Sequence, residues 1–113
     1  MKYILLSISL TVFSQFSFSG SFTKETQLSK IMAFAQDTEH TANECVLYFE
    51  TDAKSECSDK KRAVINTDSD IGKLMCSMAL TAFVANKTVE IASYDDCSTT
   101  HNAPLVRYVR VIN

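Results

Sequence analysis

Four cysteines constrain this chain more than any other feature, because each bond between two of them fixes two distant positions side by side. They are Cys45, Cys57, Cys76 and Cys97, in a chain of 113 residues. A domain of about this size buries only about 60–65% of its chain surface, so its stability margin is thin and cross-links help. Four cysteines allow three pairings, and an oxidising compartment favours disulfides.

The first 19 residues predict a signal peptide. Lys2 is the only charge among the first 23 residues, and residues 3–18 form an apolar run that is too short and too polar for a comfortable membrane span. Small residues follow, so we expect cleavage after Ser19 or Ser21. The alternative is an uncleaved anchor. We therefore predict a secreted or periplasmic protein with no membrane insertion after signal cleavage.

The chain that follows the predicted signal peptide is mildly acidic. Loss of Lys2 leaves ten Lys and Arg against thirteen Asp and Glu, which is a net charge of −3. The basic cluster at residues 60–62 is flanked by Asp59 and Glu56. The chain therefore lacks the net positive charge that attracts nucleic acid, and we expect no nucleic-acid partner.

Alternation of apolar residues predicts a hairpin followed by a third strand. Residues 20–27 are polar and predict a flexible lead-in. Residues 28–36 (LSKIMAFAQ) and residues 44–51 (ECVLYFET) both alternate, and the turn formers DTEHTAN lie between them. A polar loop then leads to residues 61–67 (KRAVINT), which predict the third strand.

The spacing changes to that of a helix over residues 68–86. Thr67 with Asp70 resembles a capping box, and Asn86 readily takes the left-handed stop position. We expect one apolar stripe to fill the core, namely Ile71, Leu74, Met75, Met78 and Ala82. A second apolar side needs another cover, from the first hairpin or from another subunit: Cys76, Leu80, Phe83 and Val84.

Two further strands complete the pattern. Residues 87–94 (KTVEIASY) place Val89 and Ile91 inward, and residues 104–112 (PLVRYVRVI) are apolar on both sides. The order β-β-β-α-β-β over residues 28–113 predicts one mainly β domain, a β-barrel of five strands with one helix, of the oligomer-binding (OB) type. An open α+β sheet is the alternative.

Residues 57–111 carry a resemblance to known proteins. The motifs are Cys57 before a strand, Gly-Lys at residues 72–73, Asn-Lys at residues 86–87 and Cys-Ser at residues 97–98. The chain thereby resembles small exported bacterial OB-fold proteins of uncharacterised function and, distantly, the receptor-binding B subunits of pertussis- and subtilase-type pentameric toxins. The resemblance implies glycan binding and ring assembly. Many relatives have aromatic and acidic residues just after the Cys-Ser, where this chain has Thr-Thr-His-Asn.

Barrel geometry and the resemblance favour the same disulfide. The third strand begins where the fourth ends, which brings Cys57 and Cys97 together, and the resemblance includes both positions. The bond would close a loop of 41 residues (97 − 57 + 1) and stabilise the fold by about 3–4 kcal/mol. Cys45 and Cys76 then form a second bond or stay as buried thiols. A bond between Cys45 and Cys57 is the rival, although an extended strand between them holds them apart.

The chain shows no pattern of a catalytic, metal or cofactor site. His40 and His101 fall in predicted loops, no close Cys and His spacing suits zinc, and only Gly20 and Gly72 are available for a phosphate loop. Pairing of Cys97 with His101 as a nucleophile is disfavoured by disulfide bonding, so we expect a solvated loop histidine. We therefore predict that the protein is not an enzyme.

Binding is the function that a small exported barrel favours. The side chains expected to supply stacking and hydrogen bonds are Tyr48, Tyr94, Arg107, Tyr108 and Arg110. The structural alternative for each is a half-buried tyrosine or a solvated sheet arginine. The first hypothesis is that the protein is a binding module for a glycan or a protein ligand and that it forms a homo-oligomer. The second is a periplasmic structural or interaction protein, such as an inhibitor or envelope-stress factor, with no small-molecule ligand.

Overall fold

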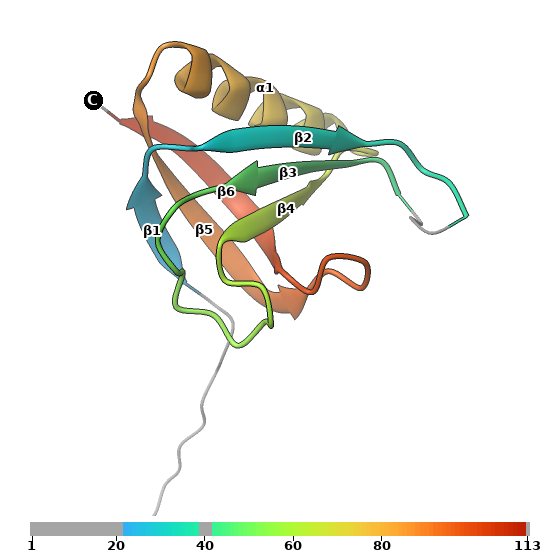
Figure 1. Cartoon of the computed structure of the whole chain (residues 1–113). Coiled ribbons are helices and arrows are strands. Elements are labelled where there is room, and N and C mark those ends of the chain that lie inside the picture. The colour runs from blue at the N-terminus through green and yellow to red at the C-terminus, as the bar shows by residue number, and fades with distance from the viewer. Residues whose placement is uncertain (1–21, 39–41, 113) are drawn as a thin grey trace, which may run out of the picture.

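The computed structural model describes residues 22–38 and 42–112, and Figure 1 shows one helix lying over one end of a strongly twisted set of strands. The predicted signal peptide, residues 1–19, and His40 lie outside the described residues. The elements are β1 (Thr23–Thr26), β2 (Lys30–Phe34), β3 (Glu44–Tyr48), β4 (Arg62–Asn66), α1 (Asp70–Val84), β5 (Thr88–Cys97) and β6 (Pro104–Ile112).

Six strands form one sheet in the described part of the chain, in the order β1-β5-β6-β4-β3-β2. This confirms a mainly β fold with one helix. The sheet order is open, however, and the prediction of a closed barrel of five strands is wrong in strand count and in closure. The predicted first hairpin is present as β2 and β3. Neighbouring strands are antiparallel except β4 and β6, which pair in parallel at Val64 and Leu105.

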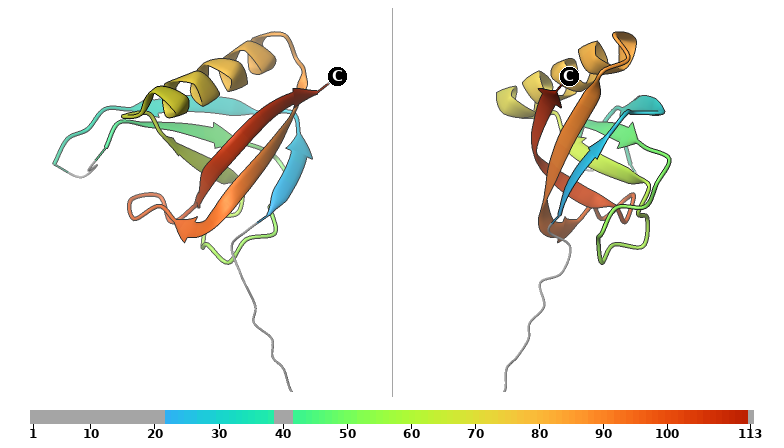
Figure 2. Two further views of the ribbon diagram at one scale, coloured as in Figure 1. Left: turned by 180° about the vertical axis from the view of Figure 1, so that it is seen from behind. Right: turned by 90° about the vertical axis from the view of Figure 1, so that its left-hand side faces the viewer.

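The additional strand, β1, lies in the segment that was predicted to be a flexible lead-in, residues 20–27. It pairs with β5 although its sequence, TKET, has no apolar residue and therefore no alternation. Its buried anchors lie just outside it, at Phe22 and Leu28. Only residues 27–29 separate β1 from β2, so the two edges of the sheet are consecutive in the chain (Figure 2).

The main core lies between the inner face of the sheet and α1. The fully buried residues that the central strands contribute are Cys45, Leu47, Ala63, Ile65, Val89 and Ile91. Val89 and Ile91 are the inward positions predicted for their strand. Aliphatic side chains at alternate positions fill this face, as expected for strands with one face against a core.

The helix presents a different stripe to this core from the one predicted. Met75 and Ala82 are buried as expected, but Ile71 and Leu74 are 60% and 54% exposed. The buried residues of α1 are Gly72, Met75, Ala79 and Ala82. Three of these four are the smallest residues of the helix, which lets its backbone lie close to the sheet. The larger side chains of the predicted stripe therefore lie beside the contact and not in it.

Local chemistry fixes both ends of α1. The N-cap is Ser69 and not Thr67, and its Oγ accepts a hydrogen bond from the amide of Gly72 at 3.1 Å. A Cβ added to Gly72 would lie 1.9 Å from the carbonyl oxygen of Asn66, so only glycine allows this approach of α1 to the end of β4. Asn86 adopts a φ of 57°, the left-handed stop that was predicted.

Strand β5 extends to Cys97, beyond the predicted end at residue 94, and its pairing with β6 is irregular. The register shifts between Ala92 and Ser93 and again before Cys97. Val106 and Val109 consequently both reach the main core, although strict alternation would place residues three apart on opposite faces.

Two disulfides join the strands to the helix and to a loop. Cys57 bonds to Cys97 across a Cα–Cα distance of 5.7 Å, and Cys45 bonds to Cys76 across 6.1 Å. These are the favoured pair and the allowed second pair, and the rival bond between Cys45 and Cys57 is not formed. By loop entropy each bond stabilises the fold by about 3–4 kcal/mol. Two disulfides fit an exported protein in an oxidising environment.

Candidate functional site

A second apolar cluster covers the outer face of β3 and β4, opposite the main core. Val46, Val64 and Ala103 are fully buried there, and the partly buried residues packed against them are Phe34, Tyr48 and Leu105. Ala103 belongs to the loop between β5 and β6, residues 98–103, which therefore lies against this outer face (Figure 1). The cluster thus brings β2, β3, β4 and the 98–103 loop with the start of β6 to one surface.

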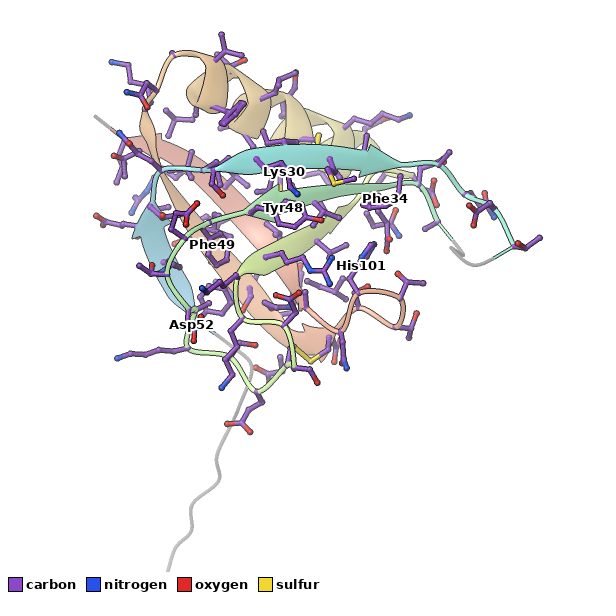
Figure 3. All side chains as sticks on the ribbon, viewed as in Figure 1. Lys30, Phe34, Tyr48, Phe49, Asp52 and His101 are labelled. Atoms are coloured by element: carbon purple, nitrogen blue, oxygen red, sulfur yellow. A yellow bond between two sulfur atoms is a disulfide. The ribbon has the colours of Figure 1, made fainter. Side chains whose placement is uncertain are left out.

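Tyr48 lies at the end of β3 on this outer face, with two cations near its ring. The Nζ of Lys30 is 4.3 Å from the ring centroid, and the guanidinium carbon of Arg62 is 5.7 Å from it. Lys30 and Arg62 are the direct register partners of Tyr48 on β2 and β4. The three residues thus form one row across three strands, and cation–π attraction draws the two charged side chains toward the ring. Figure 3 shows Lys30 next to Tyr48.

Arg62 connects this row to the neighbouring loops. Its Nε donates to Asp59 in an ion pair, Nη1 donates to the hydroxyl of Tyr48 at 3.4 Å, and Nη2 donates to the carbonyl of His101 at 3.5 Å. Burial lowers the pKa of Arg62, but the hydrogen bonds with Tyr48 and Asp59 and the charge of Asp59 outweigh that effect and raise it. The guanidinium is therefore charged at any physiological pH.

His101 is buried and does not have the solvated position predicted for it. Its side chain is 6% exposed, and Nε2 lies 3.0 Å from Oε1 of Glu44, whose side chain is 12% exposed. The same Glu44 oxygen accepts a hydrogen bond from Thr100, and the ring of Phe34 lies 4.8 Å from the imidazole. Glu44 thus holds the 98–103 loop against the start of β3.

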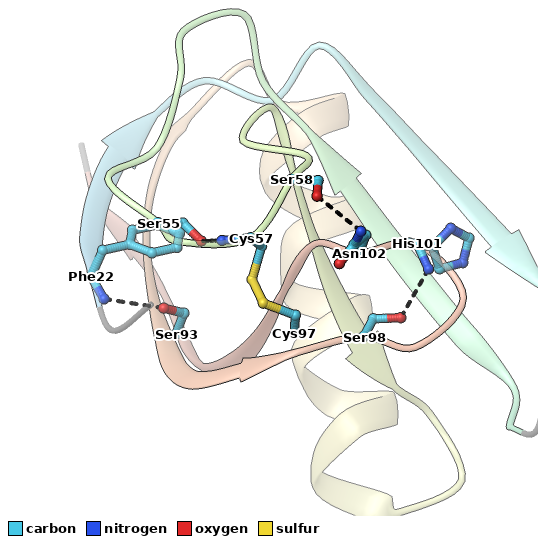
Figure 4. The surroundings of a disulfide bond; sticks show 9 residues. All are labelled: Phe22, Ser55, Cys57, Ser58, Ser93, Cys97, Ser98, His101 and Asn102. Carbon is cyan, nitrogen blue, oxygen red and sulfur yellow. Dashed lines mark hydrogen bonds between the residues drawn. A yellow bond between two sulfur atoms is a disulfide. The ribbon is translucent and has the colours of Figure 1, made fainter. Parts of the chain in front are cut away.

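A hollow of about 620 Å³ opens beside Arg62. Its lining residues are Asp52, Ser58, Asp59, Lys60, Lys61, Arg62, His101 and Asn102. Asn102 has a φ of 55° and joins the two sides of the hollow, because its Nδ2 donates to Ser58 Oγ at 2.9 Å and its carbonyl accepts from the Asp59 amide at 3.0 Å. The Cys57–Cys97 disulfide also joins the segment before β4 to the end of β5, next to the 98–103 loop (Figure 4). Covalent and hydrogen bonds of the protein itself therefore fix the walls of the hollow.

The structure distributes the five predicted ligand-binding residues over three strands. Tyr108 donates to Oε1 of Glu90 at 3.3 Å, and Arg110 forms an ion pair with the same carboxylate. Arg107 is exposed beside the Tyr108 ring, with 5.9 Å between its guanidinium carbon and the ring centroid. Tyr94 is 52% exposed on β5. Only Tyr48 belongs to the row with Lys30 and Arg62.

Sequence reasoning missed Lys30, Arg62, Glu44 and His101 as members of this site. The sequence did contain one signal for Arg62. Asp59 precedes it by three positions, a spacing at which the two charges can form an ion pair. The contact between Glu44 and His101 spans 57 positions, so it depends on the tertiary fold.

The arrangement offers fixed hydrogen-bonding groups, an aromatic ring and mixed charges. In residues 22–38 and 42–112, no group of three or more His, Cys, Asp or Glu side chains could hold a metal ion. The same residues contain no helix that is long and apolar enough to cross a membrane. No protein family, curated protein or solved structure matches the chain.

Proposed function

We propose that the protein is an exported, disulfide-bonded binding module that holds a polar, ring-bearing ligand such as a glycan. The observation that carries the proposal is the position of Arg62. Its guanidinium donates to the Tyr48 hydroxyl and lies 5.7 Å from the ring centroid, and the same residue lines the polar hollow. A ligand placed across this boundary meets an aromatic surface and hydrogen-bonding groups together. Ligand sites commonly combine these two features.

The chemistry of a sugar suits both parts of the site. Its apolar C–H face packs on an aromatic ring, and its hydroxyl groups both donate and accept hydrogen bonds. The hollow presents lysine and arginine donors beside the carboxylates of Asp52 and Asp59 and the small polar side chains of Ser58 and Asn102. The ammonium group of Lys30 is carried on a flexible aliphatic chain, so it can move away from the Tyr48 ring when a sugar packs there.

We also propose that the sheet is an OB-like arrangement in which β1 and β2 together take the place of one bent strand. Their consecutive positions at the two sheet edges support this, as do the parallel pairing of β4 with β6 and the helix between β4 and β5. OB folds bind oligosaccharides and oligonucleotides over the second and third strands and the adjoining loops. Under this correspondence those strands are β3 and β4, which carry Tyr48 and Arg62.

Export belongs to the same proposal and rests on two observations. The four cysteines form two disulfides, and the first 19 residues have the composition of a signal peptide. The mass of the unreduced protein after export tests both points, because it gives the N-terminus and the number of bonds. Retention of residues 1–19 or the presence of free thiols would contradict this part.

A glycan array followed by calorimetric titration tests the ligand class. We expect Tyr48→Ala and Arg62→Ala each to weaken binding by about 30-fold or more, since a group in a buried contact contributes about 2 kcal/mol. Tyr94→Ala is the matched control, because it removes an exposed tyrosine from β5 and should leave affinity unchanged. Absence of glycan binding, or equal loss in all three variants, would contradict a site at Tyr48.

The second candidate is an interaction protein with no small-molecule ligand. The observation that favours it is the exposure of large apolar side chains on α1, among them Leu80 at 50% and Val84 at 77%. Surfaces of this kind mark contacts with other proteins. Protein capture that is lost on substitution at Leu80 and retained in Tyr48→Ala would favour this candidate over the glycan module.

A further inference from the structure

We propose that the free edge of β2 binds an extended segment of another protein, which adds a strand to the sheet beside α1 and directs an acidic side chain toward Lys73. β1 and β2 are the outermost strands of the sheet in the described part of the chain, so one side of the β2 backbone has no neighbouring strand. In Figure 1 this free edge is the side of β2 that points away from β3. Unpaired backbone groups along such an edge accept a further strand.

The strand register identifies the backbone groups that this edge presents. Backbone groups of Asn43 and Phe49, at the two ends of β3, bond to the β4 side of the sheet. Odd-numbered residues of β3 therefore bond to β4, and even-numbered residues bond to β2, where their partners are also even-numbered. The amide and carbonyl groups of Ile31 and Ala33 consequently point away from β3, toward the free edge.

The opposite edge of the sheet, β1, is less open to a partner. Its sequence, TKET, includes two charges, and Nζ of Lys24 donates to the carbonyl of Asp52 at 3.4 Å. Residues 52–54 line a hollow together with β1, so a loop already lies beside that strand. Between Lys30 and Phe34, in contrast, β2 has only uncharged residues. Charged side chains at an edge oppose pairing with a further strand, which leaves β2 as the edge that favours it.

A groove between β2 and α1 provides space for the side chains of the added strand. It has a volume of about 340 Å³, and the residues that line it include Ala33, Cys45, Lys73, Cys76, Ser77 and Leu80. Ala33 is the register partner of Cys45, which belongs to the main core, so the groove lies on the inner face of the sheet. Leu80 is 50% exposed there. Side chains at alternate positions of the added strand point to this face, and an apolar one would cover Leu80.

Lys73 defines the charge of the partner. The lining of the groove has two charged residues, Glu44 and Lys73. Glu44 already binds His101 and Thr100. In residues 22–38 and 42–112, the ammonium of Lys73 has no ion pair, not even with Asp70, which precedes it on α1. An acidic side chain at an inward position of the added strand would give Lys73 a partner.

The same requirement distinguishes another protein from a second copy of this chain. β2 contains no acidic residue. Glu25 of β1 lies on the outer face, because its partner Glu90 alternates with the core residues Val89 and Ile91. Neither edge strand of a second copy therefore brings a carboxylate to the inner face. The contact is also independent of the glycan proposal, since the groove and the hollow beside Arg62 share no lining residue.

A display library of peptides of about eight residues tests the proposal on the exported, processed protein. Threonine alternates in the library with positions drawn from valine, leucine, phenylalanine, aspartate, glutamate and lysine, and we expect the selected peptides to carry an acidic residue. Fluorescence anisotropy of one labelled peptide gives its affinity. Lys73→Glu should weaken binding by about tenfold or more, and a peptide with lysine in place of its acidic residue should restore it. Tyr48→Ala is the control and should leave the affinity unchanged.

Methylation of peptide amides tests the backbone pairing without a change in the protein. Methyl groups on one alternate set of amides should weaken binding by about tenfold or more, and methyl groups on the other set should spare it. Ala33→Pro removes an outward amide and should act like the first set, with circular dichroism and the unreduced mass showing that the fold and both disulfides are kept. Absence of any selected peptide, or equal effects of the two methylation sets, would overturn the proposal. So would a dimer in sedimentation equilibrium that Ala33→Pro dissociates, because the edge would then belong to a second copy.

Discussion

Replacement of Gly72 by alanine measures how closely α1 approaches β4. The new Cβ would lie 1.9 Å from the carbonyl oxygen of Asn66 and 2.9 Å from its carbonyl carbon. Both are backbone atoms, so no side-chain rotation relieves the overlap, and the start of the helix or the end of β4 must move. Overpacking of this kind costs about 1–3 kcal/mol, and an overlap with backbone belongs near the upper end of that range.

Helix propensity opposes this cost but is smaller. Alanine is more favourable than glycine inside a helix by about 1 kcal/mol. The two effects leave a net loss of about 2 kcal/mol in the free energy of unfolding of Gly72→Ala. For a domain of this size, the melting temperature should fall by about 8–16 °C. Propensity alone predicts the opposite sign.

Urea unfolding followed by far-UV circular dichroism, with both disulfides intact, measures this change. Ser77→Ala is the matched control, because it also places alanine in α1, but at an exposed position, and it should change stability by less than about 0.5 kcal/mol. An unchanged or more stable Gly72→Ala protein would refute the close approach of α1 to Asn66.

Three further substitutions test the cap, a disulfide and the loop anchor. Ser69→Ala removes the N-cap of α1 and should lower the free energy of unfolding by about 1 kcal/mol in urea. The double variant Cys45→Ala, Cys76→Ala should lose about 3–4 kcal/mol in the same assay and keep its other disulfide. Glu44→Leu removes the acceptor that anchors the loop, so amide exchange in residues 98–103 should accelerate by about tenfold or more.

Each of these substitutions has a control or an opposing outcome. Glu25→Leu replaces an exposed glutamate on β1 and should leave exchange in residues 98–103 unchanged. Equal acceleration in both glutamate variants would mean that Glu44 does not anchor the loop. A cap variant as stable as the parent, or a double cysteine variant within about 1 kcal/mol of it, would contradict the cap and loop-entropy accounts.

Sequence pattern predicted the elements whose apolar residues have a clear period. β3 and β4 are short runs of apolar residues rich in Val, Leu and Ile between polar loops, and the helix has the expected stop at Asn86. β1 could not be found in this way, because its four residues are polar and its partner strand, β5, lies more than 60 residues away. Its pairing is decided by the neighbouring anchors Phe22 and Leu28, which are buried only in the folded chain.

The buried face of α1 was harder to predict for a related reason. Hydrophobicity favours the stripe with the largest apolar residues, such as Ile71 and Leu74. Close packing selected the stripe with the smallest ones, Gly72 and Ala79 among them. Similarly, Tyr48 was predicted as a binding residue from its type, but Lys30 and Arg62 are its neighbours only because of the strand register.

The two disulfides also determine how the protein responds to a protease. The spans that they close overlap without nesting, since one runs from Cys45 to Cys76 and the other from Cys57 to Cys97. A single backbone cut anywhere between Cys45 and Cys97 therefore leaves both fragments in one covalent molecule. A cut between Cys57 and Cys76 leaves them joined twice. Interlocked spans thus protect the chain against loss of a fragment after one cleavage.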